Sequence, residues 1–334
     1  MKESLSFDDV LLEPKYSEIK SRREIDIGNH LSATAYLELP VISSPMDTVT
    51  ESEMSYAIHN EGGLGIIHRY NTIEEQIALV KKTTGFTSAA IGATGDFKDR
   101  ARALFDAGTR YLCLDVAHGH HILVKTALKT LRDIFGDKVH LMAGNVATLE
   151  AYNDLADWGA DSIRVGIGGG SICSTRTSTG HGVPTFQSIH DCSYSDRRDT
   201  KLIADGGIRN SGDIVKALAA GADFVMLGSM LAGTDESPGE VFTSGNKKYK
   251  VYRGMASRIA QMDWRGKSSS PEGISTTIPY KGPVADILRD IAGNIRSGFS
   301  YSGVSSLREL QSEAKFIRQT PAGQHESSTH ILRR

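Results

Sequence analysis

The chain has 334 residues, with 38 Lys or Arg against 40 Asp or Glu and a hydrophobic content of 39%. This composition excludes a strongly basic nucleic-acid groove and a mainly disordered chain, and no apolar run approaches the roughly 18 residues that a membrane span needs. The first residues lack the blocks of a signal peptide and there are only three cysteines, which predicts a cytoplasmic globular protein that binds neither nucleic acid nor a membrane.

Eight short apolar runs recur along the chain at a nearly constant spacing. They cover residues 40–47, 63–68, 88–93, 111–117, 139–146, 162–168, 201–207 and 224–229. Each run is rich in Val, Ile and Leu, as strands buried on both faces of a parallel sheet are. Length alone allows two domains, but eight strand–helix alternations without a clear linker predict one (β/α)8 TIM barrel that spans residues 1–334.

The segments between the runs have helical periodicity. Residues 72–82 place apolar side chains on one stripe, with acidic residues first and lysines last, which suits the helix dipole. Residues 211–221 begin with Ser211 as the expected capping residue and end at Gly221.

Two segments interrupt this rhythm. A long loop is expected after the sixth strand, and residues 174–180 within it make a poor helix start. Near the C-terminus, residues 254–280 are polar and rich in Gly and Ser, which predicts a mobile flap. Because most runs end in polar or Gly residues, the strand ends are expected to form one face that carries the chemistry.

Glycine-rich turns follow three of the runs. In residues 166–176, successive glycines let backbone N–H groups approach an anion, although their spacing does not match the dinucleotide fingerprint. Asp205 to Gly207 and Gly228-Ser229 follow the seventh and eighth runs, where TIM barrels commonly bind phosphate. Asp205 has two oxygens to accept two ribose hydroxyls. Together these turns predict a nucleotide pocket.

One cysteine stands in a polar setting. Cys173 lies in the glycine-rich loop, where backbone donors and the neighbouring Arg176 favour a thiolate, and it is the candidate nucleophile. Cys113, inside an apolar run, and Cys192 are interpreted as inert buried thiols.

His118, His120 and His121 invite a metal hypothesis, but no carboxylate or Cys at ligand spacing accompanies them. A loop that contacts a ligand or caps a helix is the favoured interpretation. Glu272 in the flap has two interpretations that stay open: a solvated loop charge, or an acid/base group folded over the pocket.

Five long motifs occur in an order that resembles the IMP dehydrogenase/GMP reductase family. They lie at residues 5–12, 44–50, 168–176, 203–209 and 252–255. The resemblance spans nearly the whole chain. It implies a purine-nucleotide barrel whose loop cysteine attacks purine C2, a nicotinamide cofactor that exchanges hydride there, and a homotetramer.

Within the family, residues 113–117, 142–146 and 179–184 look like GMP reductase, while residues 61–68, 252–255 and 322–327 look like bacterial dehydrogenases. No regulatory (CBS) insertion is expected, because the chain passes directly from helix to strand near residues 83–88. The flap has no Arg-Tyr pair of the kind with which dehydrogenases activate water. GMP reductase is therefore the first hypothesis, with NADPH as cofactor and NADH as the alternative. The competing hypotheses are an IMP dehydrogenase that uses Arg265, next to Trp264, and a non-catalytic nucleotide sensor.

The resemblance also assigns roles to residues of this chain. Catalysis falls to Cys173, Thr175 and Glu272. The nucleotide GMP or IMP is expected at Ser44, Met46, Ser171, Asp205, Gly207, Gly228, Ser229, Tyr252, Gly254 and Met255. The nicotinamide side is expected at Asp115, Val116, Ala117, His118 and Gly119. Carbonyls of Gly168, Gly170 and Cys173 are expected to hold a monovalent cation such as K+, completed by Glu326 of a neighbouring chain.

Overall fold

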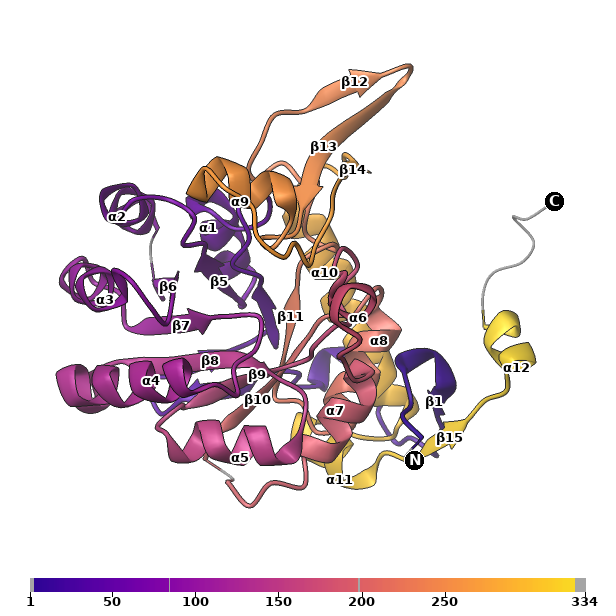
Figure 1. Ribbon diagram of the computed structural model, residues 1–334. Coiled ribbons are helices and arrows are strands. Elements are labelled where there is room, and N and C mark those ends of the chain that lie inside the picture. The colour runs from indigo at the N-terminus through magenta and orange to yellow at the C-terminus, as the bar shows by residue number, and fades with distance from the viewer. Residues whose placement is uncertain (1–2, 84, 198, 328–334) are drawn as a thin grey trace.

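The computed structural model describes residues 3–83, 85–197 and 199–327. Eight parallel strands close into a barrel surrounded by helices (Figure 1). They are β4 (Val41–Ser43), β5 (Leu64–Ile67), β6 (Ser88–Ile91), β7 (Tyr111–Asp115), β8 (His140–Val146), β9 (Ser162–Val165), β10 (Lys201–Asp205) and β11 (Phe224–Leu227). Each strand pairs with the next, and β11 pairs with β4. The predicted (β/α)8 fold and all eight strand positions are confirmed.

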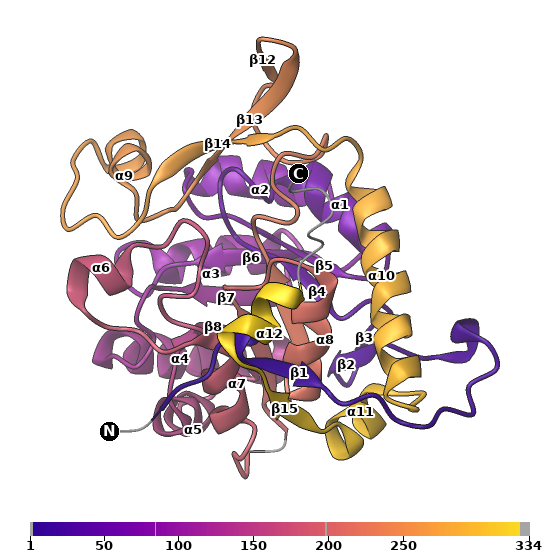
Figure 2. The same cartoon turned by 90° about the vertical axis from the view of Figure 1, so that its right-hand side faces the viewer.

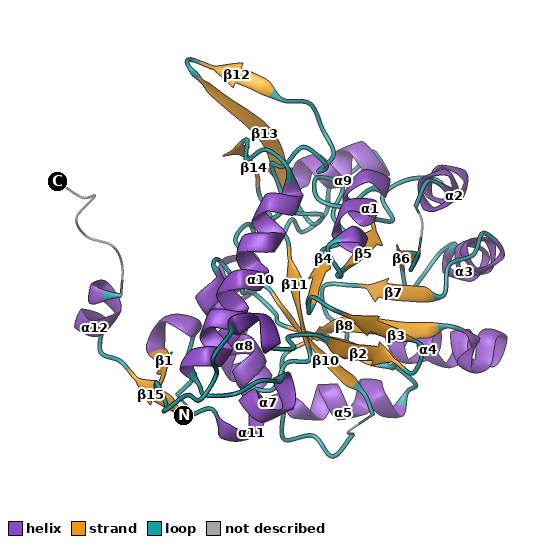
Figure 3. Ribbon diagram, turned by 180° about the vertical axis from the view of Figure 1, so that it is seen from behind, coloured by secondary structure: helices purple, strands orange, loops and turns teal. Residues whose placement is uncertain are grey.

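Helices follow every barrel strand and cover its outer surface (Figure 3). They are α1 (Ser52–Asn60), α2 (Ile73–Lys81), α3 (Phe97–Asp106), α4 (Ile122–Phe135), α5 (Leu149–Asp157), α6 (Thr175–Thr179), α7 (Thr185–Cys192), α8 (Ser211–Ala219) and α10 (Val284–Tyr301). All residues of β5, β6, β9 and β11 are buried, because helices cover one face and the barrel interior the other. In the described part of the chain, no helix has the length and apolar character to cross a bilayer.

Local capping explains where these helices begin and end. Thr72 and Glu75 form a capping box at the start of α2. The cap of α8 is Asn210, whose side chain accepts from the backbone N–H of Asp213 at 2.9 Å, so the prediction of Ser211 was wrong by one residue. Boundaries shift this way because Asn and Ser cap about equally well.

The long loop expected after β9 contains two helices, α6 and α7. The prediction of a poor helix start at residues 174–180 was wrong, since α6 forms there and ends at Gly180 with a φ of 74°. Two threonine hydroxyls donate back along this helix, from Thr177 to the Ser174 carbonyl at 2.9 Å and from Thr179 to the Thr175 carbonyl at 2.8 Å. These local bonds satisfy the polar side chains without ending the short helix.

The remaining elements close the barrel floor and line one side of it. A hairpin of β2 (Asn29–Ser32) and β3 (Ala35–Leu37) packs Leu31, Ala35 and Leu37 against the apolar barrel interior. Strand β1 (Val10–Leu12) pairs antiparallel with β15 (Phe316–Arg318). The other elements are η1 (Phe7–Asp9), η2 (Arg22–Glu24), η3 (Gly136–Lys138), α11 (Leu307–Glu313) and α12 (Pro321–Glu326). Helix α12 lies outside the ring of barrel helices (Figure 1), on the side that faces the viewer in Figure 2.

Between β11 and α10 the chain makes an excursion over the top of the barrel. It contains β12 (Phe242–Ser244), β13 (Lys247–Arg253), α9 (Arg258–Arg265) and β14 (Ser275–Pro279), and its three-stranded sheet projects from the body (Figure 1). Its two ends are joined, since Lys281 N donates to the Gly233 carbonyl at 2.9 Å and Asp235 N to the Gly282 carbonyl at 3.0 Å. The predicted flap, residues 254–280, is the second half of this excursion, and its mobility stays a prediction.

Close packing between β5 and α1 predicts an effect on stability. A methyl group added at Gly65 would lie 2.5 Å from the Ser55 Cα, so we expect Gly65→Ala to lower the free energy of unfolding by about 1–3 kcal/mol. Gly293 in α10 has open space around it, and Gly293→Ala is expected to raise that free energy by about 0.5–1 kcal/mol. Urea unfolding measures both. Equal effects of the two substitutions would contradict the packing between β5 and α1.

Candidate active site

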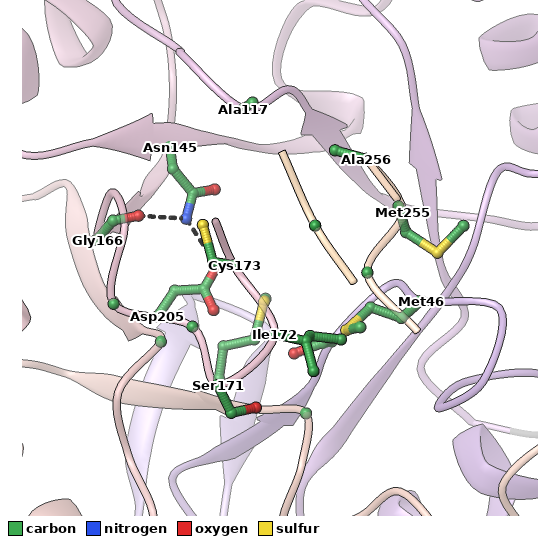
Figure 4. Close-up of a pocket in the computed structure, with 18 of the residues that line it drawn as sticks. Met46, Ala117, Asn145, Gly166, Ser171, Ile172, Cys173, Asp205, Met255 and Ala256 are labelled. Atoms are coloured by element: carbon green, nitrogen blue, oxygen red, sulfur yellow. Dashed lines mark hydrogen bonds between the residues drawn. The ribbon is translucent and has the colours of Figure 1, made fainter. Parts of the chain in front are cut away.

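A cavity of about 330 Å³ opens at the carboxyl ends of the barrel strands. Its walls come from the ends of β4, β5, β7, β8, β9, β10 and β11, together with residues 252, 254–256 and 272–273 of the excursion. All ten residues expected to bind the nucleotide line this cavity: Ser44, Met46, Ser171, Asp205, Gly207, Gly228, Ser229, Tyr252, Gly254 and Met255. In Figure 4, Asn145 and Asp205 lie on one side of it and Met46 and Met255 on the other. The sequence motifs thus converge on one site.

The three cysteines lie in different surroundings. Cys173 is exposed and lines the cavity, whereas Cys113 and Cys192 are buried. Burial raises the pKa of both Cys113 and Cys192 to about 12, so neither forms the reactive thiolate near neutral pH. Only Cys173 is therefore placed to act as a nucleophile.

A chain of two hydrogen bonds links this thiol to the flap. The Cys173 thiol donates to Thr175 Oγ1 at 3.1 Å, and the Thr175 hydroxyl donates to Glu272 Oε2 at 2.8 Å. Backbone bonds fix the position of Glu272, because its carbonyl accepts from Ser174 N at 2.9 Å and its N–H donates to the Ala256 carbonyl at 3.0 Å. The structure thus places Glu272 against the cysteine loop rather than in solvent.

Arg176 does not take part in this arrangement. Its side chain packs beside Gly168 and Gly182, and its guanidinium donates to the Val183 carbonyl at 3.1 Å. The expectation that Arg176 sits beside the sulfur and favours the thiolate was therefore wrong. The guanidinium instead holds the two ends of the loop around α6 together.

The glycine turns and several hydroxyl groups form one end of the cavity. Gly206 and Gly207 have φ values of 92° and 78°, in the left-handed region that favours glycine. A side chain at Gly206 would approach Gly170 N to 3.1 Å, so the two turns pack closely. Ser171 Oγ and the Tyr252 hydroxyl lie 3.4 Å apart at this end. Backbone N–H groups and hydroxyls together suit an anion such as a phosphate.

Two arginines in the cavity wall, Arg164 and Arg69, are not among the residues expected from the sequence. Arg164 lines the cavity from within β9 and contacts both Asp115 and Asp205. Burial alone raises the pKa of Asp115, but the charges and hydrogen bonds of Arg164 and Arg69 lower it overall. A charged residue inside the apolar run 162–168 was the signal available for Arg164, since a buried arginine needs partners.

Asp205 differs in one respect from the prediction that both its oxygens accept ribose hydroxyls. Its Oδ2 accepts from Asn145 Nδ2 at 2.8 Å and from Arg164 Nε and Nη2 at 3.1 and 2.9 Å. The second donor hydrogen of Asn145 goes to the Gly166 carbonyl at 2.9 Å (Figure 4). Three donors occupy Oδ2, which leaves Oδ1 as the acceptor for a ligand.

The residues expected at the nicotinamide side do not all line the same cavity. Asp115, Val116 and Ala117 line the cavity. His118 lines a second cavity of about 360 Å³, which shares Arg69 and Val116 with the first.

Gly119 lines neither cavity, and its N–H donates to the Asn145 carbonyl at 2.7 Å. Gly119 therefore supports the wall rather than facing a ligand.

The other two histidines have structural partners. His120 Nε2 lies 2.8 Å from Asp154 Oδ2, and the ring stacks on Trp158. His121 Nδ1 accepts from Leu123 N at 3.1 Å and caps α4, as the capping interpretation predicted. Among residues 3–83, 85–197 and 199–327, no three His, Cys, Asp or Glu side chains gather to hold a metal ion.

The expected cation ligands lie in two separate places within one chain. Gly168, Gly170 and Cys173 line the cavity, and the Gly170 carbonyl already accepts from Cys173 N at 3.1 Å. Glu326 is exposed on α12, outside the ring of barrel helices (Figure 1).

Comparisons with known proteins identify the family of this chain. A family model for the "IMP dehydrogenase / GMP reductase domain" matches residues 4–330. Inosine-5'-monophosphate dehydrogenase of Nitrosopumilus maritimus is 33% identical over 98% of this chain and 98% of that protein. GMP reductase of Leishmania major is 32% identical over 99% of this chain and 97% of that protein.

A solved structure gives the same result. The crystal structure of GMP reductase from Trypanosoma brucei, in complex with guanosine 5'-monophosphate, matches with a TM-score of 0.93 at 31% identity. This match covers 99% of this chain and 98% of that one. The chain therefore belongs to the IMP dehydrogenase/GMP reductase family, whose named members are oxidoreductases of purine nucleotides.

Proposed function

We propose that this protein is a GMP reductase, which converts GMP to IMP and ammonia with NADPH. The observation that carries the proposal is the contact sequence Cys173–Thr175–Glu272, with links of 3.1 and 2.8 Å. It combines a nucleophile with a carboxyl group that can deliver a proton, as the loss of an amino group requires. The identities of the relatives, 33% and 32%, do not separate the two activities.

The proposed chemistry begins at the exposed sulfur. The Cys173 thiolate adds to C2 of GMP while the glycine turns and hydroxyls hold the phosphate end. The proton that the Cys173 thiol gives up passes through the Thr175 hydroxyl to Glu272, which returns it by the same route to the 2-amino group, so that this group leaves as ammonia. A bound nicotinamide cofactor supplies the hydride that reduces C2. The bond between C2 and Sγ then breaks, which releases IMP and regenerates the Cys173 thiolate.

Water must be kept from this covalent intermediate, because hydrolysis would yield XMP instead. The competing hypothesis, an IMP dehydrogenase, needs a group that activates water next to Cys173. Arg265, its candidate, lines the second cavity together with Trp264 and does not line the cavity of Cys173. This separation favours the reductase.

The second cavity supports NADPH as the cofactor. It continues from the expected nicotinamide side through Arg69 and Val116, and it is also lined by His118, His121 and Arg265. Arginine suits the extra phosphate of NADPH, because the guanidinium binds phosphate oxygens in a bidentate manner. NADH, which lacks that phosphate, stays the alternative.

Further parts of the proposal concern assembly and location. We infer a single catalytic domain without an inserted regulatory module, in a cytoplasmic homotetramer. Glu326 on α12 is then available to the glycine loop of a neighbouring copy, where it would complete a monovalent cation site with Gly168, Gly170 and Cys173. The free lone pair of the Gly170 carbonyl is compatible with K+, an ion that prefers oxygen ligands.

A paired assay tests the function. Protein is mixed with GMP and NADPH, or with IMP and NAD, and the absorbance of the reduced cofactor is followed. We expect oxidation of NADPH in the first mixture and no reduction of NAD in the second. Reduction of NAD with IMP would identify a dehydrogenase instead. Nucleotide binding without turnover in either mixture would identify a sensor. Replacing NADPH with NADH in the first mixture measures the cofactor preference.

A further inference from the structure

We propose that Arg164 is a positioning residue that fixes the position of the nucleotide side of the cavity relative to its cofactor side. The inference rests on the proposed function, because that function assigns Asp205 to the nucleotide ribose and Asp115 to the nicotinamide ribose. It adds a residue that neither the motifs nor those assignments include, and a role that couples the two ligands.

The geometry is that of a single guanidinium shared by two carboxylates. Arg164 Nη1 donates to Asp115 Oδ1 at 2.7 Å, while Nε and Nη2 donate to Asp205 Oδ2 at 3.1 and 2.9 Å. The exposed fractions of the three side chains are 8%, 15% and 14%. All three line the cavity. Arg164, on β9, thus connects the end of the neighbouring β10 to the end of β7, which lies beyond β8.

Each carboxylate keeps one further anchor besides Arg164. The Asp115 backbone carbonyl accepts from Arg69 Nη2 at 3.0 Å, and Arg69 Nε lies 3.5 Å from Asp115 Oδ2. Asp205 Oδ2 accepts from Asn145 Nδ2 at 2.8 Å. These anchors hold each acid locally, but among the described residues only Arg164 contacts both acids. The relative position of the two acids therefore depends on the width and planarity of one guanidinium.

This dependence has a chemical consequence. Hydride transfer requires the purine C2 and the nicotinamide ring at a fixed separation, and a displacement of about 1 Å can cost on the order of a hundredfold in rate. Arginine and lysine are not equivalent in such a position, because a lysine ammonium is a compact charge without the arginine fork. Lysine at position 164 would keep the positive charge and contact one acid at a time.

The test compares four variants in steady-state kinetics with GMP and NADPH. We expect Asp205→Asn to raise only the KM for GMP and Asp115→Asn only the KM for NADPH, each at least tenfold. Arg164→Lys is expected to raise both KM values at least tenfold and to lower kcat. The matched control is Arg132→Lys. Arg132 also pairs with an aspartate, Asp161, and it contacts the Gly159 and Val139 carbonyls, away from the cavity lining.

The results of these assays distinguish a positioning role of Arg164 from a purely stabilising one. If Arg164 only stabilises the fold, Arg164→Lys and Arg132→Lys will lower the thermal unfolding temperature and the active fraction alike, and neither KM will move. That result, or a change in only one KM for Arg164→Lys, overturns the proposal. Should Arg164→Lys fold poorly, Arg164→Gln is measured at a temperature where most of it is folded, with the same criteria.

Binding titrations distinguish this inference from the proposed function. Variants at Arg164 are combined with Cys173→Ala, which cannot form the covalent bond, and are titrated separately with GMP, IMP, NADPH and NAD. If the wild-type protein does not oxidise NADPH with GMP, the proposed function fails. If the Arg164 variants still lose affinity for one nucleotide and one cofactor together, the coupling stands. Unchanged affinities for all four ligands overturn it whatever the reaction is.

Discussion

Cys173→Ala is expected to lower kcat by at least about a thousandfold, since it removes the atom that would bond to purine C2. Nucleotide affinity should stay within about tenfold of the native value, which corresponds to about 1.4 kcal/mol. The reason is that the groups at the phosphate end, Ser171, Tyr252 and the glycine turn at Gly207, are separate from the sulfur. Turnover is followed by NADPH absorbance and affinity by calorimetric titration of GMP.

The matched control is Cys192→Ala on α7. Cys192 is 1% exposed, so its replacement should reduce stability somewhat and leave kcat unchanged. Thiol labelling of the native protein should modify Cys173 much faster than the two buried cysteines, and GMP should protect Cys173. A Cys173→Ala protein that retains even a tenth of the native kcat would rule out the covalent mechanism.

Glu272→Gln is expected to lower kcat by about 10²–10⁴-fold, the range typical of a lost general acid or base. Gln keeps the size of the side chain and still accepts from the Thr175 hydroxyl, as Glu272 does now at 2.8 Å, but it cannot deliver a proton. The KM for GMP should change little. Stopped-flow measurement of ammonia release in a single turnover locates the defect in the first half of the reaction.

Thr175→Val provides an internal check, because it removes the hydroxyl between the sulfur and the carboxylate. If the three groups act as one chain, the double variant Thr175→Val/Glu272→Gln will be hardly slower than the slower single variant. Fully multiplied effects would mean that Glu272 works by another route. Glu240→Gln, at an exposed glutamate of the excursion, is the control and should show the native rate.

The sequence predicted the fold well because each barrel strand is a local signal. Strands such as β5 and β11 are buried on both faces, so their residues are apolar without alternation and stand out against the helices. Errors arose where neighbouring residues compete for one role, as Asn210 and Ser211 do at the start of α8. They also arose at α6, where threonine hydroxyls donate to the helix backbone rather than disrupting it.

The lining of the cavity was predictable where a polar or glycine residue follows the end of a strand, as at Asp115, Asp205 and Gly228. What local sequence does not reveal is which distant side chains meet. Thr175 and Glu272 are 97 positions apart, and only the family resemblance suggested the pair. Arg164 was missed because its two partners lie on other strands. Arg176 was misjudged because closeness in sequence to Cys173 does not fix the direction of its side chain.

The expectation that no regulatory module is inserted near residues 83–88 discriminates less between the two activities than the sequence suggested. The alignments with the dehydrogenase of Nitrosopumilus and the reductase of Leishmania major extend over 469 and 478 positions. Both are longer than this chain of 334 residues, so relatives with either name contain additional residues. The choice between the two activities therefore depends on the chemistry around Cys173 and on the paired assay.

Because of the excursion between β11 and α10, the residues of the site come from two separate parts of the chain. The barrel carries the sulfur and the glycine turns that we propose for the phosphate, while Glu272 lies on a segment whose ends are joined at Gly233 and Lys281. Such a segment is a module: it can be lengthened, shortened or exchanged without changing the strand order beneath it. Changes confined to its residues after Met255 would alter how Glu272 meets the cysteine loop, while Tyr252, Met255 and the barrel turns of the cavity keep their places.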